Sequence, residues 1–309
     1  MPPGFSSVKT MACAEQAGGE VGLAPQCSPG VEASLELDFE LDTASGRTVL
    51  ASSRQPPPLK VVRAFTLEDG SALAHLHNVS GGLLGGDRLG LRACIGAGAS
   101  VQLTTTGATR IYRPRAQAPD AIQQSHIRVE ENALLEYAPD PIIPFAGARF
   151  RQRTSIHLAP GAGLFWWEII APGREAHGEV FACERIQVKM DIWAANQLIA
   201  AESIRLEPRT RAVSSLARLG DYRYWATFYV CRAGTDRKLW LTAEQHLREV
   251  ASSLPGDARW AISTLVADGL AIRCLARQSR WVVAGLRELW STAKHLLYGR
   301  EAIPPRKVN

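Results

Sequence analysis

Alternating apolar and polar residues run along most of this chain, with the period of two that is typical of β-strands. The clearest example is residues 35–41, where Leu, Leu, Phe and Leu alternate with acidic residues. Turn-forming residues separate such segments at intervals of roughly ten residues, a spacing typical of all-β proteins. Further strands are predicted at 48–51, 59–65, 72–77, 89–95, 101–105, 121–129, 133–137, 155–158, 164–170, 185–192, 198–206 and 225–230. The pattern predicts a mainly β fold, a single multi-stranded scaffold of antiparallel or mixed sheets that are helicoidal or sandwich-like.

Two helices are predicted in the C-terminal third. Residues 242–245 (Thr-Ala-Glu-Gln) form a capping box, which predicts a helix up to about Leu254. A β-hairpin with a two-residue turn at Asp268-Gly269 follows. The second helix begins after Ser279 and ends at Gly299. Its apolar residues form one stripe: Val282, Leu286, Leu289, Ala293, Leu296 and Leu297.

The sequence predicts one domain that follows a variable N-terminal extension. Residues 1–30 are rich in Gly, Ala, Ser and Pro without periodicity, which predicts a disordered or variable segment. Residues 31–309 form the predicted β scaffold domain. No apolar run approaches the roughly 18 residues of a membrane span, and no secretory signal is recognisable. The six cysteines contain no C-x-x-C pair, which fits a reducing compartment, so we expect a cytoplasmic protein without a membrane association.

A net charge of +5 raises the question of nucleic acid as a partner. The arginines are dispersed along the chain, and no recognised nucleic-acid-binding motif accompanies them. We therefore expect no nucleic-acid partner.

The glycine-rich segment 81–90 (GGLLGGDRLG) is the most distinctive part of the sequence. Its spacing matches neither G-x-G-x-x-G nor a phosphate-binding loop that ends in G-K-[ST]. Strand alternation follows it, so there is no helix N-terminus to bind an anion. The segment brings one carboxylate, Asp87, onto a backbone with few side chains. That arrangement suits a polar passage or a close protein contact better than a nucleotide.

Histidines offer only weak candidates for a metal site. His75 and His77 are predicted on one face of a strand, and could form half of a zinc or nickel site or serve a metal-dependent hydrolase. His177 lies close to Glu179 and could contact a passing cation. The sequence contains neither G-x-S-x-G nor H-E-x-x-H. We predict that the chain is not an enzyme.

Two acidic residues lie on apolar strand faces. Glu168 shares its predicted face with Leu164, Trp166 and Ile170, and Glu202 shares its own with Leu198, Ala200, Ile204 and Leu206. A carboxylate on an apolar face is costly unless it is paired, hydrated or bound to metal. Two interpretations remain open at this point, a buried salt bridge with an arginine or an internal, water-filled polar passage.

Five segments in the same order resemble the urease accessory proteins of the UreD (also UreH) type. They cover roughly residue 33 to the C-terminus. The segments are GGLLGGDRL (81–89), LTTTGATRIYRP (103–114), LEYAPDPIIPFAGARF (within 134–150), GREAHGEVF (173–181) and YGREAIPPRKVN (298–309).

This resemblance implies a scaffold in the complex that matures urease, with an internal polar tunnel that conducts nickel. Carried over by position, the tunnel residues are Asp87, Thr109, Glu168 and Glu202, and Thr109 is indicated by the resemblance alone. Thr109 stands where the family can have serine, and Glu168 where it can have aspartate. Both keep an oxygen ligand, but its reach changes by about one carbon.

The resemblance also implies the partners. These are apo-urease and the UreF-type accessory protein, which in turn carries the UreG-type GTPase, so that GTP hydrolysis belongs to a partner. No tightly bound cofactor is expected, since nickel would be in transit. The alternatives are a β-sandwich module that binds another protein or a saccharide, or a metallohydrolase that uses His75 and His77.

Overall fold

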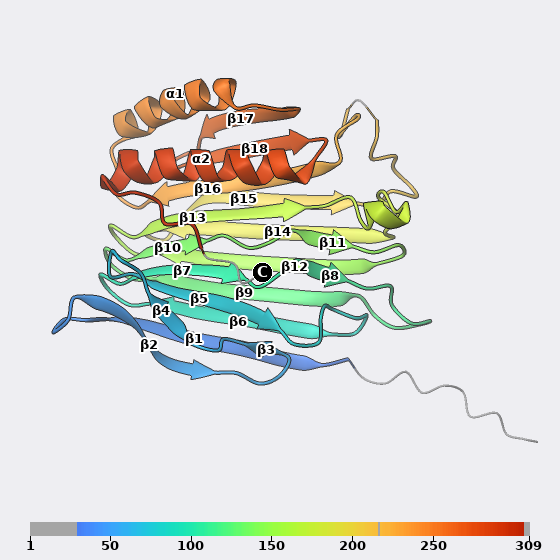
Figure 1. Ribbon diagram of the computed structural model, residues 1–309, viewed down its shortest axis with the longest axis horizontal. Helices are drawn as coiled ribbons and strands as arrows, with labels where there is room; N and C mark the ends of the chain where they lie inside the picture. Colours follow the sequence, from blue (N-terminus) through green and yellow to red (C-terminus); the bar gives the residue numbers. More distant parts are fainter. Residues whose placement is uncertain (1–29, 216, 306–309) are drawn as a thin grey trace, which may run out of the picture.

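Two β-sheets that lie face to face make up most of the molecule, and two α-helices pack on the outer face of one of them (Figure 1). The computed structural model describes residues 30–215 and 217–305. The variable extension predicted for residues 1–30 therefore lies outside the described residues, apart from Gly30. The prediction of a mainly β fold with two helices in the C-terminal third is confirmed.

The first sheet has seven strands in the order β15-β14-β12-β9-β6-β1-β2. Its centre is parallel, and only the outer pairs β1·β2 and β14·β15 are antiparallel. Its strands are β1 (Glu32–Asp42), β2 (Arg47–Arg54), β6 (Arg88–Ile95), β9 (Ala121–Val129), β12 (Arg149–Leu158), β14 (Arg185–Ala194) and β15 (Gln197–Leu206).

The second sheet has eleven strands, most of them in the order β17-β18-β16-β13-β10-β7-β5-β3. Its main strands are β5 (Ala72–Asn78), β7 (Ser100–Thr105), β10 (Leu134–Tyr137), β13 (Gly163–Ile170), β16 (Tyr224–Arg232), β17 (Ala258–Thr264) and β18 (Gly269–Ala276). The short strands are β3 (Leu59–Lys60), β4 (Ala64–Thr66), β8 (Thr109–Ile111) and β11 (Ile142–Pro144).

The chain passes repeatedly from one sheet to the other. Strands β5, β7, β10 and β13 are parallel neighbours in the second sheet, while β6, β9, β12 and β14 are parallel neighbours in the first. Each circuit therefore adds one strand to each sheet beside the strand of the previous circuit. The path is helicoidal and the sheets are stacked, so both descriptions offered by the sequence apply.

Apolar side chains fill the space between the sheets, which we call the gap. They come from the inward faces of both sheets and include Leu37, Phe39, Leu103 and Trp166. A second apolar cluster lies between the second sheet and the helices. Because β13 is covered by the first sheet on one face and by the helices on the other, all of its residues are buried.

The helices are α1 (Arg237–Ser253) and α2 (Ser279–Tyr298). The start predicted for α1 is wrong, because the helix is capped by Asp236, whose carboxylate accepts the Lys238 N–H at 2.7 Å. Thr242 of the predicted capping box lies inside the helix, where its hydroxyl donates to the Lys238 carbonyl. The predicted end of α2 is confirmed, since Gly299 adopts a left-handed conformation with φ 61°. No helix among the described residues is long and apolar enough to span a membrane.

Three strand details differ from the sequence prediction. The strand expected at 59–65 is divided into β3 and β4, and the strand expected at 155–158 already begins at Arg149. The hairpin loop is longer than two residues, because Gly269 is already part of β18 and its carbonyl accepts the Leu265 N–H. Asp268, with φ 54°, supplies the left-handed residue of this loop.

Candidate functional site

Glu168 is a buried acid without a cationic partner. It projects from β13 into the gap and is 8% exposed. Its carboxylate accepts a hydrogen bond from Gln152 Nε2 on β12, in the opposite sheet. Among the described residues, no lysine or arginine forms an ion pair with it. Burial raises the pKa of Glu168 to about 7; the Gln152 hydrogen bond opposes this rise, and the negative charge of Glu202 adds to it.

A small polar cavity lies beside this carboxylate. Its volume is about 20 Å³, and Gln123, Ser125 and Gln152 line it from the first sheet. Tyr137 and Glu168 line it from the second sheet. A volume of this size holds roughly one water molecule. Glu168 is therefore placed to interact with a single water molecule or a small ion.

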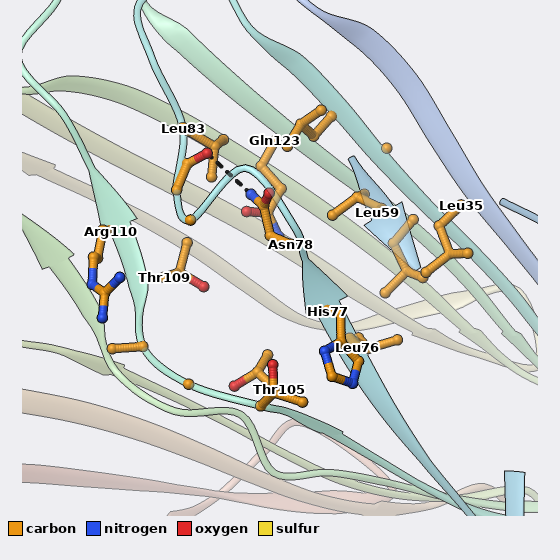
Figure 2. Close-up of a pocket in the computed structure, with 18 of the residues that line it drawn as sticks. Leu35, Leu59, Leu76, His77, Asn78, Leu83, Thr105, Thr109, Arg110 and Gln123 are labelled. Atoms are coloured by element: carbon orange, nitrogen blue, oxygen red, sulfur yellow. Dashed lines mark hydrogen bonds between the residues drawn. The ribbon is translucent and has the colours of Figure 1, made fainter. Parts of the chain in front are cut away.

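A larger cavity of about 190 Å³ adjoins the small one. Figure 2 shows Thr109 and Arg110 on one side of this cavity and His77 on the other. Arg110 is exposed, so this cavity reaches the surface. The two cavities have Thr109, Gln123 and Tyr137 in common, so the small cavity beside Glu168 lies next to the one that reaches the surface.

Thr109 is held where these cavities meet. It is the first residue of β8, and its N–H donates to the carbonyl of Pro141 at 3.0 Å. Its side chain lines both cavities. The structure therefore brings Thr109 and Glu168, two of the four predicted tunnel residues, into one polar region.

Glu202 also points inward, but both of its oxygens have partners. Tyr229 donates its hydroxyl to Oε2 at 2.7 Å, and the Arg273 guanidinium lies 3.1 Å from Oε1. The salt-bridge interpretation therefore holds for Glu202 and not for Glu168. A bulge in the β14·β15 pairing also changes its neighbours, because Ile199 is buried while Leu198, predicted on the inward face, is 40% exposed.

Three polar residues and one methionine line up in register across the first sheet. Thr154 is fully buried, and its hydroxyl has no hydrogen-bond partner within the described part of the chain. A buried hydroxyl without a hydrogen-bond partner is costly unless a water molecule or an ion lies in the gap beside it. The residues of this row, from β9 to β15, are Ser125, Thr154, Met190 and Glu202.

The second sheet carries a matching row. Glu168 on β13 pairs in register with Thr227 on β16, which in turn pairs with Arg273 on β18. The first row ends at Glu202 on the edge strand β15 and the second ends at Arg273 on β18, and these two residues form an ion pair between the sheets. The sequence analysis missed Thr227 and Arg273, because a polar residue within a strand carries no sign of the face on which it lies.

Asp87 braces the glycine-rich segment. Its Oδ1 accepts the N–H of Val31 at 2.9 Å and its Oδ2 accepts the N–H of Leu84 at 2.8 Å. The side chain is not among those that line the two cavities. A tunnel role for Asp87 stays a prediction, whereas its role in holding the loop is evident.

The glycines of this segment are needed for close packing. A Cβ atom at Gly82 would lie 2.5 Å from the Arg110 carbonyl oxygen, and one at Gly85 would lie 2.4 Å from Pro114 Cβ. The close contact expected from the glycine-rich sequence is thus formed within this chain.

His177 and Glu179 do not form a joint site. His177 is exposed at the end of a short 3₁₀ helix, η1 (Glu175–His177). Glu179 forms a bidentate ion pair with Arg174 and also accepts the Ala146 N–H. The Arg174 hydrogen bonds lower the pKa of Glu179. A cation would have to displace Arg174, so these two residues offer no ready ligand pair.

The other histidines lie in different surroundings. The ring of His75 contacts Phe65, while His77 lines the larger cavity. No group of three or more His, Cys, Asp or Glu side chains that could hold a metal ion occurs within residues 30–215 and 217–305. The described residues therefore provide no third ligand for the metallohydrolase alternative.

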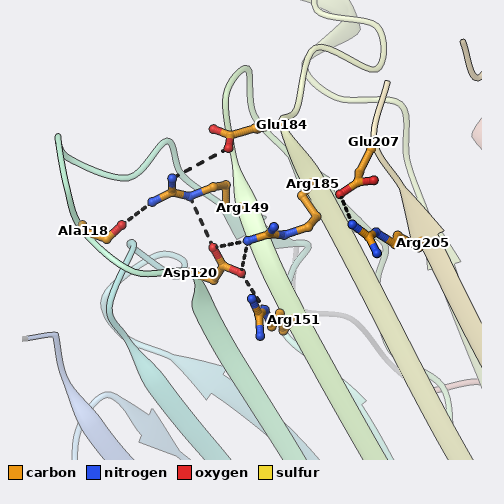
Figure 3. A network of polar contacts seen from close by, with 8 residues as sticks. All are labelled: Ala118, Asp120, Arg149, Arg151, Glu184, Arg185, Arg205 and Glu207. Atoms are coloured by element: carbon orange, nitrogen blue, oxygen red, sulfur yellow. Dashed lines mark hydrogen bonds and ion pairs between the residues drawn. The ribbon is translucent and has the colours of Figure 1, made fainter. Parts of the chain in front are cut away.

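A separate polar network surrounds Asp120 at the start of β9 (Figure 3). Arg149, Arg151 and Arg185 all approach this one carboxylate, with the closest nitrogen of Arg185 at 2.6 Å. Burial opposes ionisation of Asp120, but hydrogen bonds from Arg185 and Arg151 outweigh it and lower the pKa. The network joins the starts of β9, β12 and β14 and stabilises the first sheet away from the gap.

Comparison with known proteins gives consistent matches along nearly the whole chain. The family model described as UreD urease accessory protein matches residues 31–309. A urease accessory protein UreD of Herpetosiphon aurantiacus is 44% identical over 276 residues, which cover 89% of this chain and 95% of that protein. The corresponding protein of Pseudomonas aeruginosa PAO1 is 33% identical over 280 residues (90% and 95%), and that of Bacillus sp. TB-90 is 28% identical over 261 residues (84% and 94%).

Proposed function

This chain belongs to the UreD family of urease accessory proteins, and on that basis we propose that it serves urease maturation by conducting nickel through the gap between its sheets. The observation that carries this proposal is Glu168, a buried carboxylate without a cationic partner among the described residues, beside a small cavity that adjoins a larger one at the surface. Nickel is the cargo in this proposal, and the chain itself performs no catalysis.

Oxygen ligands suit such a conduit. Nickel binds nitrogen and sulfur donors tightly, so a closed cluster of Cys and His would retain the ion. A conduit must bind weakly at several positions so that the ion can leave. Thr109, Gln152 and Glu168 offer oxygen atoms in sequence along the cavities. Because the space beside Glu168 holds roughly one water, the ion must exchange most of its hydration shell for these oxygens.

We further propose that the chain docks apo-urease and a UreF-type accessory protein, which brings the UreG-type GTPase. The membership in an accessory family supports an association with urease and its other accessory proteins. The glycine-rich segment packs against its own chain and gives no phosphate cradle, which agrees with GTP hydrolysis by a partner. Co-purification of the full chain with apo-urease and each accessory protein tests this part.

Nickel loading tests the conduit. Urease is matured with accessory complexes that contain the wild-type chain or Glu168→Gln, and its nickel content is measured by elemental analysis. Glu168→Gln keeps an acceptor for Gln152 and removes the charge, so the complex should assemble while urease receives less nickel. Asp191→Asn is the matched control, because Asp191 pairs with Arg153, on the outer face of the first sheet. Full nickel loading with Glu168→Gln rejects the conduit.

A further inference from the structure

The ion pair between Arg273 and Glu202 lies where the rows of the two sheets end. Arg273 Nη2 lies 3.1 Å from Glu202 Oε1, and Tyr229 donates to the other oxygen. The arginine side chain is 56% exposed, whereas that of Glu202 is only 8% exposed. Glu202 thus faces the interior, and its positive partner stands on the solvent side.

This arrangement obstructs a cation. An ion that reaches Glu202 from the gap finds both carboxylate oxygens engaged and meets a positive charge a few ångströms away. We propose that Arg273 is a latch that keeps the Glu202 end of the passage closed in the isolated chain, and that a carboxylate of the receiving protein draws it away. This inference rests on the proposed nickel conduit and concerns its regulation.

The surroundings of Arg273 leave its side chain room to move away from Glu202. It lies in register between Thr227 on β16 and Ala261 on β17, and Ala261 is exposed. The long side chain therefore borders solvent on the β17 side and can turn outward. The Arg273 side chain is 56% exposed, so water can hydrate the guanidinium once it has left Glu202. After the arginine departs, Glu202 still accepts the Tyr229 hydroxyl and keeps its position.

A fully buried ion pair between the same sheet and helix α2 shows the contrast. Lys294 Nζ lies 2.8 Å from Glu136 Oε1, and these side chains are 2% and 4% exposed. Neither partner can reach water without unpacking α2. In the other pair, Glu202 is buried but Arg273 is exposed. A reversible closure needs such a difference, because one residue can then move while the other stays in place.

Nickel access to Glu202 in the isolated full-length chain tests the latch. Ni²⁺ is paramagnetic, so a bound ion broadens nearby methyl signals, and Ile204 lies on the same face of β15 as Glu202. We expect Arg273→Gln to reduce the Ni²⁺ concentration for half-broadening of the Ile204 methyl signals about tenfold, because the repelling charge is removed. Arg273→Lys, which keeps the charge, should behave like the wild type. Adding Glu202→Gln to Arg273→Gln should abolish the gain.

Arg277→Gln is the matched control. Arg277 follows directly after β18, is 49% exposed and pairs with Asp221 and Asp257, away from Glu202. A general charge effect would give the same gain in this control and would overturn the proposal, as would equal behaviour of the Gln and Lys variants at Arg273. A melting curve confirms folding of each variant, and Arg273→Met serves as a second neutral replacement.

The latch and the conduit can fail separately. If Arg273→Gln shows no gain at Ile204 while Glu168→Gln lowers the nickel content of urease, the latch is wrong and the conduit stands. If Glu168→Gln leaves urease fully loaded, the conduit is wrong and the latch has no passage to close.

Discussion

Glu136 and Glu168 lie on neighbouring strands of the second sheet and are buried on opposite faces of it. Glu136 faces the helices, where Lys294 and the Trp290 indole N–H both bind its carboxylate. Glu168 faces the gap, where Gln152 is its hydrogen-bond donor and no lysine or arginine within the described residues pairs with it. The same residue type thus stabilises the fold on one face and forms a candidate site on the other.

Loss of Lys294 should destabilise the fold. Lys294→Met leaves the Glu136 charge buried without a cation, which costs about 3–5 kcal/mol. Urea unfolding at pH 7 measures the difference. The double variant Glu136→Gln, Lys294→Met keeps an acceptor for Trp290 and removes both charges, so it should recover most of the loss. Equal stability of the single variant and the wild type would contradict this account of the pair.

A methyl group should be tolerated at Gly107 but not at Gly82 of the glycine-rich segment. Gly82→Ala places Cβ 2.5 Å from the Arg110 carbonyl oxygen, where a backbone must shift, and should cost about 1–3 kcal/mol. Gly107→Ala is the control, because nothing lies within 4 Å of its Cβ position, and its effect should stay within about 0.5 kcal/mol. Melting temperatures of both variants give the comparison, and similar values would show that packing does not determine this loop.

The period-two pattern located most strands because their inward faces are apolar. It failed in the first half of β12, where Gln152 and Thr154 point inward and interrupt the alternation. Gln152 binds Glu168, and Thr154 lies in register with Glu202 two strands away, so the failure occurred at the candidate site itself. Polar residues on an inward face make a strand hard to recognise and at the same time make a polar interior.

Glu168 and Glu202 could be singled out from the sequence as acids on apolar faces, but their partners could not. Glu202 meets Arg273, which is 71 residues away in the chain, through the stacking of two sheets. No local pattern encodes that contact. Only the tertiary structure therefore shows whether a buried acid forms a salt bridge. Glu202 forms one with Arg273, and Glu168 forms none with a described lysine or arginine.

Asp120→Asn should weaken the fold near neutral pH. It removes the ionised acceptor for Arg151 and Arg185, and hydrogen bonds of this charged kind contribute about 1.5–3 kcal/mol. Because the pKa of Asp120 is lowered in the folded chain, its stabilisation is present above the unfolded pKa and is lost as the pH falls through the folded pKa. Urea unfolding at pH 7 and pH 3 should show a smaller difference from the wild type at pH 3. A constant difference would reject the linkage.

Glu168→Gln should show the opposite dependence on pH. Burial raises the pKa of Glu168 from 4.5 to about 7, so the folded chain holds this proton more tightly than the unfolded chain. The resulting stabilisation is complete below about pH 4.5 and is lost as the pH rises through 7. Relative to the wild type, the Gln variant should therefore be about equally stable at pH 4 and more stable by about 3 kcal/mol at pH 8. Urea unfolding of both proteins across this range measures the difference. A pH-independent difference would mean that Glu168 is ionised and compensated in the gap, and the weak, exchangeable oxygen site that the conduit requires would then lose its support.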